Sequence, residues 1–349
     1  MATGTIHGWI ASAKDKPLEW GEQPRKTFDD DTVEMDITHC GICASDLFTL
    51  DSGWGKTDYP TIVGHEIAGI VTKVGNNVKN VKVGDRAGVG AQCMSCLQCY
   101  ACQHHEENIC ENGVIGTYNG RWPKTNERTY GGYADVWSGH YNFVFKIPDS
   151  LPNEVAATFF CAGITTYAPM KRHGINSDST VGVIGIGGLG HYATQWGNAM
   201  GAKVIALSHS DRKRGDAEKL GCHDYVVTED ETSMSKIKNK LTHIICTSFG
   251  TENFDWGKYL GLLKPGGVFI MVAVPDKPFT NIPPGALVGR QITLAGSVVG
   301  SPDTIREMLA FAAEKGVKPW IEKRPMKQCP ETVQAMRDGK ARYRFVLEN

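Results

Sequence analysis

Four cysteines, Cys96, Cys99, Cys102 and Cys110, stand in the run CMSCLQCYACQHHEENIC with a Cys-x2-Cys-x2-Cys-x7-Cys spacing. Three thiols at three-residue intervals on a tight loop, closed by a fourth thiol, can surround one tetrahedral Zn²⁺ with Zn–S bonds of about 2.3 Å. Such a set leaves no ligand position open. The spacing therefore predicts a structural zinc site, which would fix this loop wherever the rest of the chain folds.

Two other interpretations of the cysteines stay open. Cys93 extends the series backwards, and the set Cys93, Cys96, Cys99 and Cys102 loosely resembles an iron–sulfur run. That run has three residues before its last cysteine and a proline after it, and neither feature is present. Disulfides would be the alternative in a secreted chain. The N-terminus has no apolar stretch long enough for a signal peptide, so we expect a reducing, cytoplasmic setting.

Length and charge narrow the function class. The chain has 349 residues, which is comfortable for two domains with separate cores. The formal net charge is -1, so no field of either sign attracts nucleic acid or an acidic membrane. No run of about 18 apolar residues predicts a membrane span. A zinc-ribbon nucleic-acid binder is disfavoured as well, because QHHEEN beside the cysteine loop is not basic.

The predicted secondary-structure pattern changes twice along the sequence. Up to about residue 148, short β-like runs such as EIAGIVTKVG, KVGDRAGVG and YNFVFKIP alternate with glycine. From about residue 161, strand-like and helix-like segments alternate, which is typical of βαβ units on a parallel sheet. After about residue 299 a helix-like segment leads to a last strand-like run. We expect an α/β protein with a doubly wound parallel sheet and a second, β-rich domain.

A glycine motif lies at the start of the alternating region. Gly185, Gly187 and Gly190 form a GxGxxG directly after the β-branched strand TVGVI and directly before a helix-like segment. The glycines allow a tight turn and the close approach of a pyrophosphate to a helix N-terminus, where free N–H groups favour anions. We therefore predict a dinucleotide site that includes Gly188 and Leu189.

The residue that ends the second strand of this region, KVIAL, predicts which dinucleotide is bound. It is Ser208, whereas an NAD enzyme would carry an acid there for the ribose 2'-hydroxyl. Asp211 lies past the strand end and is discounted. Donors and cations suited to a 2'-phosphate follow the strand: Ser210, Arg212, Lys213 and Arg214. NADP(H) is therefore favoured over NAD(H), and a solvated basic helix turn is the alternative.

A second set of candidate site residues is spread over three segments: CGICASD at 40–46, GHE at 64–66 and CAG at 161–163. Together with GDRAGVGAQ, the cysteine loop, CAGITTY, GIGGLG and the terminal RYRF, these segments resemble the zinc-dependent medium-chain dehydrogenases/reductases. The resemblance is to the cinnamyl alcohol dehydrogenase-like branch, which includes fungal NADPH-dependent alcohol dehydrogenases. It extends over essentially the whole chain.

The resemblance implies a fold and a reaction. A GroES-like catalytic domain would comprise residues 1–160, completed by 299–349, and a Rossmann domain would comprise 161–298. Hydride would pass between NADPH and aromatic (cinnamyl-type) or medium-chain aldehydes, in a homodimer with two zinc ions per chain. Two alternatives are an NAD-dependent polyol dehydrogenase, which would need an acid at position 208, and a non-catalytic relative, which should have lost a metal ligand.

The resemblance also implies site residues. Cys43, His65 and Cys161 would bind the catalytic zinc, with Glu66 as a near or exchanging fourth ligand. Two thiolates and one imidazole leave one position for a substrate oxygen. The expected catalytic residues are His65 itself, Asp46, which would accept the free N–H of His65, and Ser45, whose hydroxyl would touch the substrate oxygen. The family threonine near the nicotinamide corresponds to Thr165.

Three positions depart from the family pattern. Phe48 stands where these enzymes often place a relay histidine. Gly116 and Val298 stand where plant lignin enzymes tend to carry a tryptophan and a phenylalanine. A roomier apolar pocket lined by Trp54, Leu287 and Val298 is therefore expected, which suggests a broad reductase of aromatic and medium aliphatic aldehydes.

Overall fold

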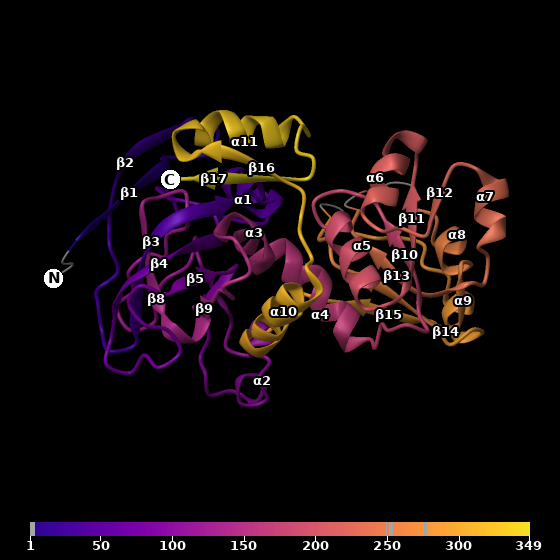
Figure 1. The fold of residues 1–349 in the computed structure, drawn as a ribbon, viewed down its shortest axis with the longest axis horizontal. Coiled ribbons are helices and arrows are strands. Elements are labelled where there is room, and N and C mark those ends of the chain that lie inside the picture. Colours follow the sequence, from indigo (N-terminus) through magenta and orange to yellow (C-terminus); the bar gives the residue numbers. More distant parts are fainter. Residues whose placement is uncertain (1–3, 249, 251–253, 276–277) are drawn as a thin grey trace. The chain divides into compact units, whose positions relative to one another are not determined.

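The computed structural model describes residues 4–248, 250, 254–275 and 278–349. The chain forms two compact units, of which unit 1 comprises Met1–Ile164 and Val299–Asn349, and unit 2 comprises Thr165–Val298. The sequence placed the boundaries after residues 160 and 298. Unit 1 contains both ends of the chain, and its indigo N-terminal and yellow C-terminal elements appear together in Figure 1.

The main sheet of unit 1 has seven strands, which join segments from the two ends of the chain. Its order is β16 (Ile321–Pro325), β17 (Arg344–Glu348), β3 (Thr32–Gly41), β4 (Glu66–Val74), β5 (Arg86–Val89) and β9 (Phe145–Lys146), with β8 (Val136–His140) also paired to β3. Only β16 and β17 are parallel neighbours, and the other pairs are antiparallel. The C-terminal strand is thus an interior strand of the N-terminal sheet.

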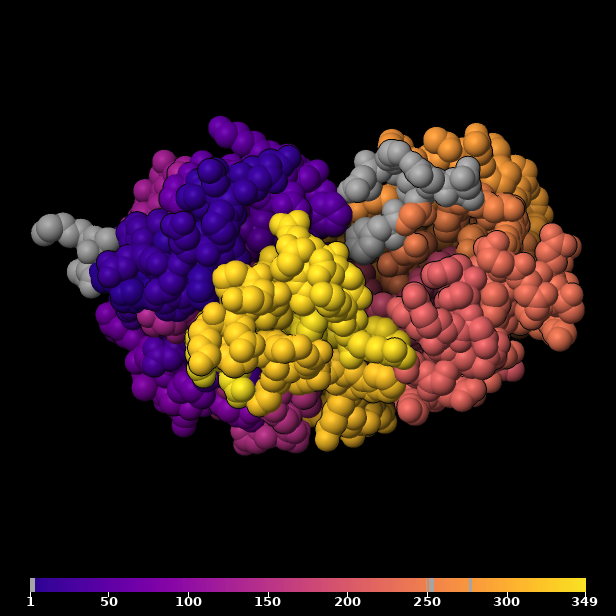
Figure 2. Space-filling view, turned by 90° about the horizontal axis from the view of Figure 1, so that it is seen from above, coloured from indigo at the N-terminus to yellow at the C-terminus, as the bar shows by residue number. Residues whose placement is uncertain are grey.

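Smaller elements complete unit 1. Two hairpins are formed by β1 (Thr5–Ala11) with β2 (Leu18–Pro24) and by β6 (Gln92–Met94) with β7 (Ile115–Gly116). The helices are α1 (Ala44–Leu50), α2 (Tyr100–Gln103), α3 (Asn153–Thr158), α10 (Pro302–Lys315) and α11 (Cys329–Arg337), with a π-helical turn at Phe159–Gly163 and 3-10 turns at Glu107–Ile109, Tyr141–Phe143 and Met326–Gln328. In Figure 2 the yellow C-terminal segment lies against the indigo N-terminal segment.

The core of unit 1 forms around β3. This strand, TVEMDITHCG, is buried along almost its whole length because its neighbours and the helices cover both faces. Val33, Met35 and Ile37 point into an apolar cluster that also includes Phe345 and Leu347 of β17. Residues from positions more than 300 apart in sequence therefore share one core.

Unit 2 is a parallel six-stranded sheet with connecting helices. The strand order is β12 (Asp224–Val227), β11 (Lys203–Ser208), β10 (Thr180–Ile184), β13 (Leu241–Cys246), β14 (Leu263–Met271) and β15 (Thr293–Gly296). Its helices are α4 (Ile164–Arg172), α5 (Gly190–Ala199), α6 (Arg214–Lys219), α7 (Glu231–Lys236), α8 (Trp256–Leu260) and α9 (Pro284–Val288), with a 3-10 turn at Asp211–Lys213.

In chain order the unit 2 strands read 3-2-1-4-5-6, which is the doubly wound dinucleotide-binding arrangement. The strand runs VGVI, VIAL and HIIC are continuously apolar because helices cover both faces of a parallel sheet. The doubly wound parallel sheet of unit 2 and the separate β-rich unit 1 agree with the predicted fold class. Within the described ranges, none of the helices has both the length and the apolar character that crossing a membrane requires.

Candidate active site and metal sites

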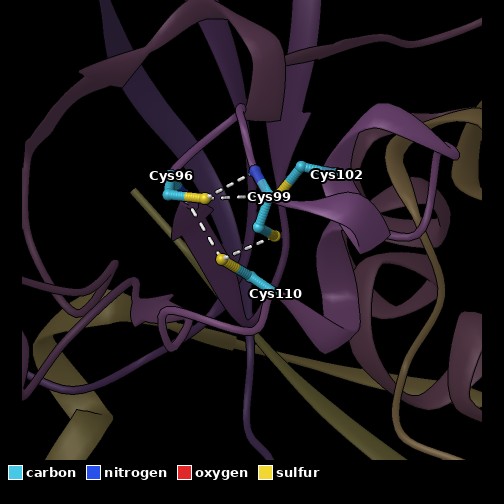
Figure 3. A group of neighbouring side chains, drawn as sticks. All are labelled: Cys96, Cys99, Cys102 and Cys110. Carbon is cyan, nitrogen blue, oxygen red and sulfur yellow. Dashed lines mark hydrogen bonds between the residues drawn. The ribbon is translucent and has the colours of Figure 1, made fainter.

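The four cysteines of the loop after β6 converge on one point. Their sulfur atoms all lie within 4.8 Å of one another, and Figure 3 shows Cys96, Cys99 and Cys110 turned toward each other. The Cys96–Cys102 and Cys99–Cys110 Sγ–Sγ distances are 3.9 and 3.8 Å. A tetrahedron with Zn–S bonds of about 2.3 Å has edges of about 3.8 Å. The loop is thus folded to the dimensions of a tetrathiolate zinc site.

Backbone N–H groups stabilise negative sulfur in this loop. The amides of Gln98 and Cys99 donate to Cys96 Sγ at 3.5 and 3.3 Å, and the amide of Glu111 donates to Cys99 Sγ at 3.4 Å. The Gln98 amide is the main cause that lowers the pKa of Cys96 to about 6, whereas desolvation raises the pKa of Cys102 to about 12. These backbone donors therefore favour the thiolate forms of Cys96 and Cys99, which are the forms that bind metal.

The alternative cysteine sets do not form. The buried Cys93 directs its thiol to the carbonyl of Gly116 at 3.3 Å and does not belong to the group of four. All eleven cysteines lie in the described part of the chain, and each is a free thiol. Neither the iron–sulfur set nor a disulfide framework is present.

A second, fully buried group brings together Cys43, His65 and Cys161, whose ligand atoms lie within 4.8 Å of one another. Cys43 is the N-cap of α1, His65 directly precedes β4, and Cys161 lies in the π-helical turn before α4. The Cys43 and Cys161 sulfurs are 3.8 Å apart, again the edge of a zinc tetrahedron. His65 Nε2 is buried without a hydrogen-bond partner among the described residues. These donors fit a zinc ion that keeps one ligand position open.

The electrostatics of this group suit a cation. The neighbouring Cys161 thiol holds the pKa of Cys43 well below its usual range. Burial lowers the pKa of His65, but the charges of Asp46 and Cys43 outweigh burial and raise the pKa to about 9. The negative charges around His65 therefore favour a proton on its imidazole. A metal ion can take the place of that proton.

Glu66, the expected fourth ligand, lies outside the group of three. Its Oε1 forms an ion pair with Arg344 and accepts the amide N–H of Ala162 at 3.3 Å. Both partners of the ion pair are buried, and burial raises the pKa of Glu66 to about 7. The structure thus places Glu66 on Arg344 rather than at a ligand position. Sequence reasoning missed Arg344, whose only signal was the terminal RYRF.

Asp46 also differs from the expectation. No hydrogen bond joins it to His65 within the described residues; its Oδ2 accepts the amide of Cys43 at 2.8 Å and the hydroxyl of Tyr133 at 2.9 Å. Its Oδ1 accepts the amide of Gly64 at 3.2 Å. The reason is local, because Asp46 is the N3 residue of α1 and reaches back to its N-cap. Cys-x-x-Asp before a helix was the sequence signal for this role.

Other predicted residues surround the three ligands. Ser45 Oγ lies 3.6 Å from Cys43 Sγ. Phe48 stacks on Trp54 at 4.7 Å with a 9° interplanar angle. The buried Tyr118, which sequence reasoning did not assign to the site, stacks on the His65 imidazole at 5.3 Å and 4°. Ser45 thus brings a hydroxyl next to a ligand sulfur.

The residues expected to line an apolar pocket belong to different units. Trp54 belongs to unit 1 and is half exposed. Leu287 packs against the core of unit 2, and Val298 at the end of that unit is 55% exposed. Gly116 lies in the short strand β7. The pocket stays a prediction.

The glycine loop follows β10 in unit 2. Gly185 has φ +83°, which favours glycine, and a Cβ on Gly190 would lie 1.8 Å from the carbonyl oxygen of Gly185. A Cβ on Gly187 would meet no protein atom within 4 Å. Thr247 donates its hydroxyl to the Gly185 carbonyl at 2.8 Å and holds the turn. The loop therefore has open space in front of the N-terminus of α5, where a pyrophosphate could lie.

Ser208 ends β11, the neighbour of β10 in the sheet, and is buried. Asp211, which was discounted as an NAD-type acid, forms an ion pair with Arg214 at 2.7 Å. Arg214 also packs on the ring of Tyr225 at 4.8 Å. The acid near the strand end is therefore already paired with a cation.

Three further predicted phosphate contacts and Thr165 have different surroundings. Lys213 Nζ donates to the carbonyl of Ile186 at 2.5 Å, which brings this ammonium group to the glycine loop. Arg212 is exposed, whereas the carbonyl of Ser210 accepts the Tyr225 hydroxyl at 2.6 Å. Thr165 is buried in the first turn of α4. Of the cations in this segment, Lys213 is the one in contact with the loop.

Comparison with known proteins gives a consistent result. Residues 29–149 match the alcohol dehydrogenase GroES-like domain, and residues 188–314 match the zinc-binding dehydrogenase family. Cinnamyl alcohol dehydrogenase 7 of Oryza sativa is 41% identical over 93% of this chain and 87% of its own length. NADP-dependent alcohol dehydrogenase C 1 of Mycolicibacterium smegmatis is 38% identical over 99% and 98%.

Solved structures agree over the whole chain. A cinnamyl alcohol dehydrogenase from Sorghum bicolor superposes with a TM-score of 0.93 at 34% identity, covering 99% of this chain and 98% of its own. The enzyme CAD from Helicobacter pylori, solved with NADP(H), has a TM-score of 0.90 at 31% identity with the same coverage. The chain therefore belongs to the zinc-dependent medium-chain dehydrogenases, in the branch of the cinnamyl alcohol dehydrogenases.

Proposed function

We propose that this protein is an NADP-dependent zinc alcohol dehydrogenase that interconverts alcohols and aldehydes of the aromatic, cinnamyl type or of medium chain length. The observation that carries the proposal is the buried group of Cys43, His65 and Cys161, with its two sulfurs at the separation of zinc ligands and an unpartnered imidazole nitrogen. Residues 1–160 with 299–349 would form the catalytic domain, and residues 161–298 the nucleotide domain.

Zinc in this site would supply Lewis-acid polarisation of a carbonyl oxygen, and NADPH would supply the hydride. The chain itself orients the ligands: Asp46 holds the backbone of Cys43 and of Gly64, next to His65. Ser45 Oγ, beside the Cys43 sulfur, is placed to hold a proton near the reacting oxygen. Phe48 cannot pass that proton on, because a phenyl ring stacked on Trp54 has no exchangeable proton. The last proton step would therefore use water or buffer.

Preference for NADP(H) is supported by the surroundings of β11. Ser208 brings no charge that would repel a 2'-phosphate, and Asp211 is paired with Arg214. Lys213 is in contact with the glycine loop. A structural relative binds NADP(H), and a sequence relative is named as NADP-dependent.

The loop cysteines Cys96, Cys99, Cys102 and Cys110 would hold a second, structural zinc, which makes two per chain. Four thiol ligands leave no open position, so this ion would stabilise the loop without entering the reaction. A homodimer in the cytoplasm completes the proposal. The partners are then small aldehydes and alcohols rather than nucleic acid or membrane.

Elemental analysis combined with three cysteine variants tests the metal assignment. Native protein should carry two zinc ions per chain. Cys43→Ser should lose one zinc and nearly all turnover while keeping its thermal stability, and Cys99→Ser should lose one zinc and chiefly stability. Cys222→Ser is the matched control, because this thiol belongs to neither group and lies 3.9 Å from Thr194 Oγ1. One zinc, or iron, in the native protein would contradict the proposal.

Initial rates with a panel of aromatic and aliphatic aldehydes test the substrate and the cofactor. We expect kcat/KM with NADPH to exceed that with NADH by at least tenfold, which needs about 1.4 kcal/mol of differential transition-state binding. Equal use of both cofactors, or activity only on polyols with NAD, would favour the polyol dehydrogenase. Full metal content without turnover on any member of the panel would favour a non-catalytic relative.

A further inference from the structure

Tyr133 is a fully buried residue that lies between the two segments carrying Cys43 and His65. Its hydroxyl donates to Asp46 Oδ2 at 2.9 Å, the same oxygen that accepts the amide N–H of Cys43 at 2.8 Å. We propose that Tyr133 is a positioning residue of the catalytic metal site, which fixes the Asp46 carboxylate and through it the backbone of the ligand Cys43 and of Gly64, the residue before the ligand His65.

The Tyr133 ring also packs directly on the segment before His65. Gly64 has φ +101°, and a Cβ at that position would lie 2.6 Å from Tyr133 Cδ1. The amide of Tyr133 donates to the carbonyl of Val63 at 3.0 Å, and the amide of Gly132 donates to the carbonyl of Gly64 at 2.7 Å. Backbone pairing therefore fixes the distance between Tyr133 and the His65 segment, and the ring occupies the space that a side chain at Gly64 would need.

Asp46 connects these contacts to both ligands. Its two oxygens receive three hydrogen bonds, from Cys43 N, Gly64 N and Tyr133 OH. Two of the donors belong to the backbone next to metal ligands, whereas the Tyr133 hydroxyl comes from a third segment and sets the rotation of the carboxylate. Without that hydroxyl, the carboxylate keeps only one backbone donor on each oxygen and holds Cys43 and Gly64 at a less fixed separation. Loss of such outer contacts typically lowers metal affinity 10- to 100-fold.

The test compares Tyr133→Phe with Tyr130→Phe in the zinc-loaded protein. Tyr130 is a matched control, since it lies three residues away, packs against the same core, and donates its hydroxyl to Gln23 Oε1 at 2.8 Å. A chromogenic chelator reports zinc release, and the Cys43→Ser and Cys99→Ser variants assign the two release phases. For Tyr133→Phe we expect release from the Cys43–His65–Cys161 site to be at least tenfold faster, and release from the four-cysteine site to be unchanged.

A spectroscopic readout separates positioning from general stability. Cobalt(II) in place of zinc should give a shifted visible spectrum from the three-ligand site in Tyr133→Phe and the native spectrum in Tyr130→Phe. Native release rates and a native cobalt spectrum in Tyr133→Phe would overturn the inference, even if its unfolding temperature fell. If Tyr133→Phe is not recovered folded, Asp46→Asn is measured in the same way, and native release from that variant would overturn it.

The inference rests on the proposed metal site, and the same measurements distinguish the two failures. A single release phase in the native protein would refute the proposed function. Two native phases that Tyr133→Phe leaves unchanged would refute only the role of Tyr133.

Discussion

Gly187 and Gly190, two glycines of the loop after β10, should respond differently to the same substitution. Gly190→Ala should destabilise unit 2, because the new Cβ would lie 1.8 Å from the carbonyl oxygen of Gly185. Gly187→Ala should leave stability unchanged, because its Cβ would meet no protein atom within 4 Å and the position does not have positive φ. The second variant should nevertheless bind NADPH poorly if the pyrophosphate occupies that space.

The magnitudes follow from the contact distances. Ordinary van der Waals contact of a Cβ begins near 3.4 Å, so Gly190→Ala requires the loop or α5 to shift by more than an ångström. Overpacking of this kind costs about 1–3 kcal/mol, of which improved helix propensity offsets about 0.5–1 kcal/mol. Each kcal/mol of lost stability lowers the unfolding temperature by about 3 °C, so Gly190→Ala should lower it by several degrees. For Gly187→Ala a tenfold weaker NADPH affinity corresponds to about 1.4 kcal/mol.

Thermal unfolding without cofactor and quenching of tryptophan fluorescence by NADPH measure the two effects separately. Gly285→Ala in α9 is the matched control, since a Cβ there also meets nothing within 4 Å and the residue is remote in sequence from the loop. Native NADPH affinity in Gly187→Ala would show that the pyrophosphate does not lie against this loop. Native stability in Gly190→Ala would refute the close approach of the α5 N-terminus to Gly185.

Three further changes have defined outcomes. Ser208→Asp should narrow or reverse the preference for NADPH in kcat/KM, because the new charge repels a 2'-phosphate; an unchanged ratio would contradict this reasoning. Arg344→Met should lower the free energy of unfolding by about 3–5 kcal/mol, because it leaves Glu66 buried without its cation. A second change, Glu66→Leu, should restore most of this loss. If thermal unfolding shows the double variant to be less stable than the single variant, the result would be inconsistent with a buried ion pair. Ser45→Ala should lower turnover by about 10² or more with two zinc ions retained, and normal turnover would exclude the hydroxyl from proton transfer.

The sequence was most informative where structure depends on near neighbours. Apolar runs of four or five residues, followed by helix-like segments, predicted the parallel sheet of unit 2, and the fold class is confirmed. From its residues alone unit 1 was predicted only as β-rich, and its GroES-like fold, completed by residues 299–349, came from the family resemblance. Its sheet depends on pairing between β3 and β17, where Cys40 meets Leu347, and no local pattern specifies a partner so distant in sequence.

The same division holds for the candidate site. The spacing of the loop cysteines was enough to predict a cluster that the structure brings together. Cys43, His65 and Cys161 lie on three separate segments, so only the family resemblance grouped them. Asp46 differs from its expected role through a local cap that Cys-x-x-Asp could have signalled, although its further partner Tyr133 lies 87 residues away, and Glu66 differs because its partner Arg344 lies 278 residues away. Long-range hydrogen bonds of this kind leave no periodic signal.

The position of β17 inside the sheet of unit 1 has a consequence for synthesis on the ribosome. Every strand of unit 2 is translated before residues 344–348, whereas the edge of β3 at His39–Gly41 lacks its β17 partner until those residues are made. Arg344, the cation that compensates the buried Glu66, is translated in the same stretch. A nascent chain therefore carries the expected metal ligands on an incomplete unit 1, and loss of residues 344–349 alone would remove an interior strand together with that cation.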